Sequence, residues 1–215
     1  MPGRGANGAN EDQPSDVLGS RIIVVGSSCV GKSTLGERLA AAVDAPFVEL
    51  DALFWQPNWT ETPDAEFATK ILAATEGERW VVAGNYHRHT LPTIWPRANT
   101  VLWLDFPLPL VLWRIVRRSW KRSRSRELLW GTNYEPFWSQ FKFWSDESLI
   151  GFTLRSHGKR KRFYRQAMAN EQWRHITFSR LASKKAVDGL ATEVEGAARG
   201  RPLESTAGEP GATGP

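Results

Sequence analysis

Short continuous apolar runs alternate along this chain with longer stretches of mixed polarity. Runs of five or six mostly apolar residues are typical of strands buried on both faces of a parallel sheet. These runs occupy positions 21–25, 46–50, 79–84, 100–105 and 174–178. The pattern therefore predicts five parallel strands.

The segments between these runs carry apolar residues at helical spacing. Leu35, Leu39 and Val43 share one face of a helix that is expected to begin near Lys32. Further helices are predicted at about 62–75, 107–122, 136–148, 159–170 and 183–198. Because helices join consecutive strands, the expected fold class is α/β, with the parallel sheet covered by helices on both faces.

Both ends of the chain are rich in Gly, Pro, Ala and polar residues, so 1–19 and 199–215 are expected to be disordered tails. Between them we expect one domain over 20–198. About seventy residues separate the fourth and fifth strands, which is too long for a simple crossover. A helical lid is therefore predicted as an insert at about 117–165.

The turn after the first strand has the spacing G-x-x-x-x-G-K-S, which is the phosphate-binding loop of P-loop proteins. Backbone N–H groups of such a loop and the positive end of the following helix bind phosphates. Lys32 would bridge the outer phosphates of ATP, and the Ser33 hydroxyl would bind Mg²⁺. The predicted nucleotide-binding residues of the loop are Gly26, Ser27, Ser28, Cys29, Val30, Gly31, Lys32, Ser33 and Thr34. The motif indicates a P-loop NTPase three-layer sandwich with strand order 2-3-1-4-5.

Two acidic residues, Glu49 and Asp51, come at the end of the second apolar run. On a strand their side chains would share one face, at the edge of the sheet where ligands bind in open α/β folds. One carboxylate could bind a Mg²⁺-bound water, and the other could orient a substrate hydroxyl. Ser33, Glu49 and Asp51 are thus the metal candidates, and Asp51 is also a catalytic and substrate candidate. The alternative is ordinary polarity at a strand end, or a helix cap.

The net charge of +5 is concentrated in two blocks. Residues 114–126 contain seven Arg or Lys and no acid, and residues 155–165 contain six more. Such blocks can bind nucleic acid, close over the phosphates of a nucleotide, or form a solvated face. Aromatic residues lie between the blocks and could form a small core of the lid or stack on bases, among them Trp130, Tyr134, Trp138, Phe141 and Trp144.

The segment 104–118 resembles the part of adenylate kinases that leads into their lid. The matching residues are Asp105, Pro107, Arg114, Ile115 and Arg118. The resemblance implies that Arg114 packs on adenine and that Arg118 contacts phosphates. Together with Arg160 and Arg162, Arg118 would neutralise charge on the transferring phosphoryl group.

Four pieces of the chain are similar to the bacterial FlaR-type family, also called DNA topology modulation proteins, of adenylate-kinase-like P-loop proteins. They are ELDALFWQPNW (49–59), GNYHR (84–88), LDFPLPLVLWRIVRR (104–118) and ELLWGTNYEPFW (127–138), and the resemblance covers about residues 20–180. Ala83 occupies the position where both families often carry an acid. Metal positioning would then fall to Glu49 and Asp51, as in the D-x-D of shikimate kinase.

We therefore expect a P-loop kinase that passes a phosphoryl group from Mg·ATP to a small-molecule acceptor. The candidate acceptor residues are Asp51, Trp55, Trp59, Asn85 and Arg88. Lys70 is the only basic residue in 52–78, which disfavours a phosphate-bearing acceptor. His87 and His89 are interpreted as surface residues. The alternative function is a nucleotide-dependent regulatory protein whose basic lid binds DNA or a partner.

Other features bear on the cellular setting. The chain has no run of eighteen apolar residues, and its first twenty residues lack the apolar core of a signal peptide. Its single cysteine excludes an intrachain disulfide. We expect a cytoplasmic protein, monomeric or homodimeric, that does not bind a membrane.

Overall fold

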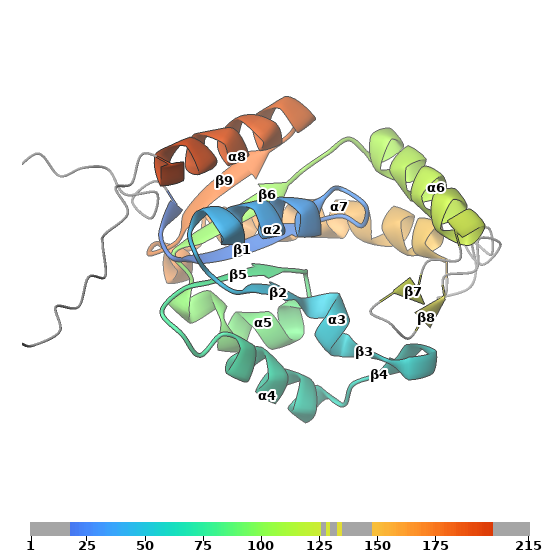
Figure 1. Cartoon of the computed structure of the whole chain (residues 1–215), viewed down its shortest axis with the longest axis horizontal. Coiled ribbons are helices and arrows are strands. Elements are labelled where there is room, and N and C mark those ends of the chain that lie inside the picture. The colour runs from blue at the N-terminus through green and yellow to red at the C-terminus, as the bar shows by residue number, and fades with distance from the viewer. Residues whose placement is uncertain (1–17, 126–127, 130–132, 135–147, 200–215) are drawn as a thin grey trace, which may run out of the picture.

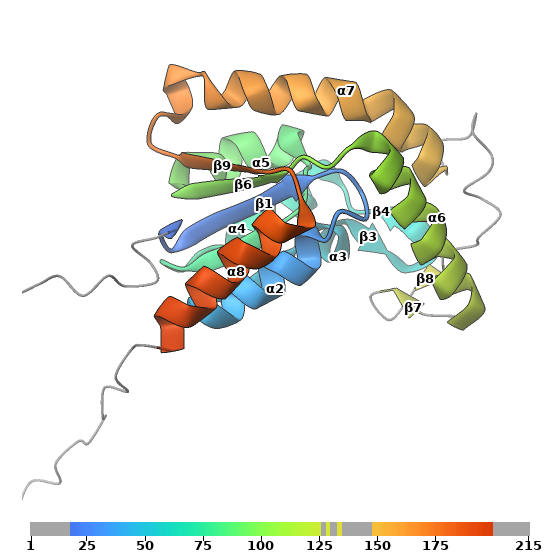
Figure 2. The same cartoon turned by 90° about the horizontal axis from the view of Figure 1, so that it is seen from above.

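A central parallel sheet carries helices on both of its faces (Figures 1 and 2). The structure is a computed structural model, which describes residues 18–125, 128–129, 133–134 and 148–199. The strands lie in the order β2-β5-β1-β6-β9, and every neighbouring pair is parallel. Their bounds are β1 Arg21–Gly26, β2 Phe47–Glu49, β5 Trp80–Ala83, β6 Thr100–Leu104 and β9 Thr177–Leu181. The predicted α/β fold and its strand order are confirmed.

Helices pack on both sides of the sheet, as the two buried clusters show. One face is covered by α2 (Lys32–Ala42), α6 (Leu108–Ser125) and α8 (Lys184–Arg199). The other is covered by α4 (Asp64–Ala74), α5 (His87–Thr93) and α7 (Leu149–Met168). Among the residues with assigned positions, no helix is both long enough and apolar enough to cross a membrane.

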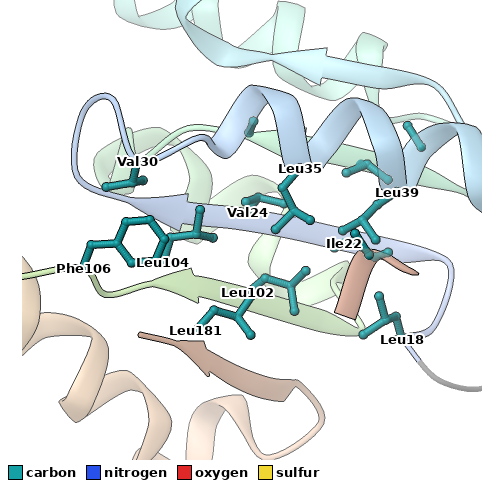
Figure 3. Packing of buried hydrophobic residues seen from close by; sticks show 14 of the residues in the cluster. Leu18, Ile22, Val24, Val30, Leu35, Leu39, Leu102, Leu104, Phe106 and Leu181 are labelled. Atoms are coloured by element: carbon teal, nitrogen blue, oxygen red, sulfur yellow. The ribbon is translucent and has the colours of Figure 1, made fainter. Parts of the chain in front are cut away.

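The alternation of side chains along the central strand builds both halves of the core. Ile22 and Val24 face α2, whereas Ile23 and Val25 face the opposite layer. Figure 3 shows Ile22 and Val24 packed beside side chains of β6 and α2. Because β1 is buried on both faces, the loop that follows it starts from a rigid support.

The segment after β2 differs from the predicted extension of that strand. The strand ends at Glu49, and the chain turns into α3 (Leu50–Phe54). A short hairpin follows, formed by β3 (Trp55–Gln56) and β4 (Thr60–Glu61), with the turn η1 (Pro57–Trp59) between them. Leu50 is fully buried at the start of α3, which explains why the apolar run continued past the strand.

The last strand and two helices also differ from their predicted bounds. The strand predicted at 174–178 lies at Thr177–Leu181, where it pairs with β6. The turn η4 (Glu171–Trp173) occupies the preceding positions, and Ile176 is buried although it precedes the strand. The helix predicted at about 159–170 is the second half of α7, and α5 was missed because Pro92 lies inside it. The helix predicted at 136–148 lies outside the described residues, apart from Ser148.

The ends of the domain and the insert are described in part. Leu18 is buried, and its carbonyl oxygen accepts a hydrogen bond from Thr100, so the folded domain begins no later than Leu18. In the insert, β7 (Leu128–Leu129) pairs with β8 (Asn133–Tyr134). The Asn133 amide accepts a hydrogen bond from Trp59 N and donates one to Gln56 O. This part of the insert is therefore docked on the β3–β4 hairpin.

Candidate active site

The phosphate-binding loop joins β1 to α2 and depends on two glycines. Gly26 has φ 148°, and a Cβ there would lie 2.6 Å from the Leu104 carbonyl oxygen. Gly31 has φ 100° and precedes the first turn of α2. Other residues rarely adopt these angles, so the loop requires glycine at both positions.

Lys32 lies at the centre of a group of charged side chains. Its Nζ donates a hydrogen bond of 3.0 Å to the Ser27 carbonyl oxygen, across the loop. Burial lowers the pKa of Lys32, Asp51 opposes this shift, and Arg160 and Arg118 add to it. The structure therefore places Asp51, Arg118 and Arg160 near Lys32. All three were predicted to be catalytic residues.

The two acids have different partners. The Ser33 hydroxyl donates a hydrogen bond to Glu49 Oε1. Asp51 lies in α3, so the expectation that both acids share a strand face is wrong; its Oδ1 accepts a hydrogen bond of 2.7 Å from the Tyr86 hydroxyl. Burial and Asp51 raise the pKa of Tyr86, which therefore remains a donor.

Glu49 is also the neighbour of Ala83 in the sheet, because the two residues are paired in the register of β2 and β5. A carboxylate of β2 therefore lies beside the position that Ala83 occupies on β5. Hydroxyl and carboxylate oxygens such as those of Ser33 and Glu49 are ligands that Mg²⁺ accepts. In the part of the chain that the structure describes, no group of three or more His, Cys, Asp or Glu could hold a metal ion. These two side chains fit a Mg²⁺ ion that is shared with nucleotide phosphates.

The predicted arginines divide into two groups. Arg160 is only 9% exposed, and its Nη1 has no hydrogen-bond partner among the described residues. Arg114 donates a hydrogen bond of 3.0 Å to the Val30 carbonyl oxygen and lies over the Phe106 ring. Two of the predicted arginines, Arg162 and Arg88, are exposed: Arg162 lies about 200° around the helix from Arg160, and Arg88 forms an ion pair of 2.9 Å with Asp64. The structure does not bring these two to the loop.

Four aromatic side chains, which we call the aromatic wall, lie beside Asp51: Phe54, Trp55, Trp59 and Tyr86. The Phe54 ring lies 4.8 Å from that of Tyr86, and Trp55 and Trp59 contact edge to face at 5.5 Å. Trp55 also lies close enough to the Tyr86 hydroxyl to oppose the rise of its pKa, and Tyr86 in turn contacts Asp51. The predicted acceptor residues Trp55 and Trp59 therefore belong to one cluster with the carboxylate.

Asn85 has a partner that the sequence did not suggest. Its amide binds both main-chain polar groups of Gly26, and Tyr164 of α7 reaches the same amide. His87 hydrogen-bonds Tyr164 and packs on Phe163, so its interpretation as a surface residue is wrong. No spacing in the sequence indicates these contacts, because α7 is more than seventy residues away along the chain.

Two further contacts connect α7 to the loop side of the sheet. His157 Nδ1 lies 3.2 Å from the Ser27 hydroxyl. Lys161 pairs with the buried Asp105 at 3.1 Å, and Arg180 of β9 pairs with the same carboxylate at 2.6 Å. The helix that follows the insert is thus held against the loop at several points.

A parallel sheet of this order, with a glycine-rich loop between its central strand and the next helix, defines a P-loop kinase-like nucleotide-binding fold. No family model matches the chain. A shikimate kinase of Paramagnetospirillum magneticum is 31% identical over 130 residues, which are 52% of this chain and 67% of that protein. The chain therefore belongs to the family of adenylate-kinase-like P-loop kinases that includes this shikimate kinase.

Two solved structures are also similar. The shikimate kinase of Bacteroides thetaiotaomicron is 16% identical with a TM-score of 0.49, and the match covers 82% of this chain and 97% of that one. A gluconokinase of Sinorhizobium meliloti is 17% identical with a TM-score of 0.44, covering 84% and 91%.

Proposed function

We propose that this protein transfers the γ-phosphoryl group of ATP to a hydroxyl of a small-molecule acceptor. The observation that carries the proposal is the convergence of Lys32, the Ser33–Glu49 pair and Asp51 at one edge of the sheet. The relative that is named a shikimate kinase supports the same class of reaction. The FlaR-type subgroup remains a prediction from the motifs.

Each side chain has a role that its position supports. The loop N–H groups and Lys32 bind the phosphates of ATP, and Arg160 and Arg118 place positive charge beside them. Asp51, which Tyr86 holds in place, accepts the hydrogen bond of the acceptor hydroxyl and takes its proton. The acceptor oxygen forms a bond to the γ-phosphorus as the bond to the bridging oxygen breaks, and ADP leaves. Ser33 and Glu49 would hold Mg²⁺, which would supply positive charge beside the phosphate oxygens.

The acceptor would lie against Asp51 and the Trp55, Trp59 and Tyr86 side chains of the aromatic wall. The basic side chains of α4 and α5 do not reach it, since Lys70 pairs with Glu66 and Arg88 with Asp64. An anionic group on the acceptor would therefore depend on Arg118 and Arg160. Shikimate, after the name of the relative, is the first compound to test.

The test is a screen of hydroxylated metabolites, including shikimate and gluconate, for ADP release in the presence of Mg·ATP. Acceptor-dependent ADP release that Lys32→Ala and Asp51→Asn both abolish would support the proposal. The proposal fails if Lys32→Ala turns over ATP as fast as the wild type does.

A second candidate function is nucleotide-dependent binding of DNA through the basic face of α6. The observation that favours it is the exposure of two large aromatic rings there, Trp113 at 55% and Trp120 at 56%, with Arg117 lying over Trp113. Aromatic rings interleaved with basic side chains are typical of surfaces that bind single strands. Affinity for single-stranded DNA that falls steeply with salt would support this function, and no binding at low salt would exclude it.

A further inference from the structure

The Asn85 amide binds the first glycine of the phosphate-binding loop through both of its polar atoms. Gly26 N donates to Asn85 Oδ1 at 3.1 Å, and Asn85 Nδ2 donates to the Gly26 carbonyl oxygen at 2.9 Å. This pair of contacts fixes which amide atom is oxygen and which is nitrogen. Gly26 is the residue whose backbone angle starts the loop, so the position of the amide sets the position of the loop.

Tyr164 connects this amide to His87. The Tyr164 ring is fully buried, and its hydroxyl lies 3.0 Å from Asn85 Oδ1 and 2.7 Å from His87 Nε2. The phenol has one proton, and Asn85 Oδ1 can only accept. The phenol therefore donates to Asn85, and His87 Nε2 must donate to the phenol.

The protonation states of His87 and Tyr164 agree with donation from His87 to Tyr164 and from Tyr164 to Asn85. Burial, with a smaller effect of Arg160, lowers the pKa of His87 to about 4, so the ring is neutral near pH 7. Burial also raises the pKa of Tyr164, which keeps its proton. A neutral His87 with its proton on Nε2 satisfies every contact in the chain of hydrogen bonds.

The same helix also carries Arg160, four residues before Tyr164 and on the same face. Arg160 is buried near Lys32, and His157 one turn earlier contacts the Ser27 hydroxyl. Fixing Tyr164 against the loop thus also fixes the distance of Arg160 from the loop.

We propose that His87 and Tyr164 are positioning residues, which act through a directed chain of hydrogen bonds from His87 to Tyr164 to Asn85 to Gly26. These hydrogen bonds hold the phosphate-binding loop in its binding conformation. They also keep Arg160 at a fixed distance from the loop. Neither residue touches the nucleotide. The inference rests on the proposed function only in that the loop binds ATP.

The test compares Mg·ATP affinity, measured by calorimetry, between the wild type and two ring-preserving variants. Tyr164→Phe should weaken binding about tenfold, since it removes the donor to Asn85. His87→Phe should weaken binding by only about twofold, because Tyr164 can still donate to Asn85. Thr75→Val is the matched control: it removes a buried hydroxyl that bonds Ile71 O away from the loop, and it should bind ATP as the wild type does.

Wild-type affinity in Tyr164→Phe, or a larger loss in His87→Phe than in Tyr164→Phe, would overturn the proposal. If Tyr164→Phe does not fold, the ¹⁵N shifts of His87 in the wild type decide instead. An Nε2–H tautomer supports the proposed chain of hydrogen bonds, and an Nδ1–H tautomer overturns it. If the wild type itself does not bind ATP, the proposed function fails, whereas the tautomer measurement still tests the chain of hydrogen bonds.

Discussion

The hydroxyl of Ser33, at the start of α2, donates a hydrogen bond to the carboxylate of Glu49, at the end of β2. Glu49 is in turn paired in the sheet with Ala83, the position where related families often carry the acid. The carboxylate beside the loop serine is therefore carried by β2, next to the position that Ala83 occupies in the sheet.

Glu49→Gln is expected to raise the Mg²⁺ concentration needed for ATP turnover and to lower the rate by about 10- to 100-fold. The amide keeps the shape of the side chain but loses the charge that favours a cation. A Mg²⁺ titration of ADP release measures both effects. Glu37→Gln, an exposed change on α2, the helix that carries Ser33, is the control, and an unchanged Mg²⁺ requirement in Glu49→Gln would contradict the metal role.

Asp51→Asn should reduce acceptor-dependent phosphoryl transfer by about 10²- to 10⁴-fold, because it removes the group that takes the acceptor proton. ATP affinity should change little, since Asp51 contacts Tyr86 and not the loop backbone. Steady-state kinetics and calorimetry separate the two quantities. Asp64→Asn removes a carboxylate on α4 that pairs with Arg88, and it should leave transfer unchanged.

Arg160→Met should lower the rate of transfer by about 10²- to 10³-fold, the usual effect of removing one charge-stabilising donor. Arg88→Met should have no measurable effect on the rate, because Arg88 is exposed and pairs with Asp64. The two arginines were both predicted site residues, so the comparison tests the distinction that the structure makes. Equal losses in the two variants would contradict it.

Acid should destabilise the wild type between pH 6.5 and about 4 through His87. Unfolded His87 binds a proton below its ordinary pKa of 6.5, whereas the folded state resists protonation down to about 4, so the free energy of unfolding falls as the pH falls through this window. The full effect is at most about 3 kcal/mol. Urea unfolding at pH 7 and pH 4.5 should show a smaller pH-dependent loss in His87→Phe, and equal losses would contradict the shift.

Asp105→Asn should destabilise the fold by about 2 kcal/mol, because it removes the carboxylate that Lys161 and Arg180 share. Asp105 is only 4% exposed, but the side chains of Lys161 and Arg180 are 30% and 45% exposed, so water solvates both cations in the variant and limits the loss. Urea unfolding gives the change. Asp188→Asn breaks an exposed pair with Lys184 and should cost less than about 1 kcal/mol.

Much of the fold follows from local pattern. The apolar runs predicted the sheet, and the loop motif predicted the order of its strands, because a buried parallel strand and a glycine-rich turn are each encoded by adjacent residues. Where the apolar pattern did not distinguish a strand from the buried residues next to it, the predicted bounds of that strand were wrong. Leu50 continues the apolar run after β2, yet it is buried from a helix, and the run that included Ile176 begins before the strand that pairs with β6.

The sequence by itself determined the phosphate-binding loop, the acids Glu49 and Asp51 around the end of β2, and the two basic segments. The tertiary structure decided which of these side chains meet: Glu49 with Ser33, Asp51 with Tyr86, and Arg160 rather than Arg88 near Lys32. It also decided that Asn85 holds Gly26. The reason is physical: these contacts join residues far apart in the chain, and only the packing of α7 and the strands of the sheet brings them within hydrogen-bond distance.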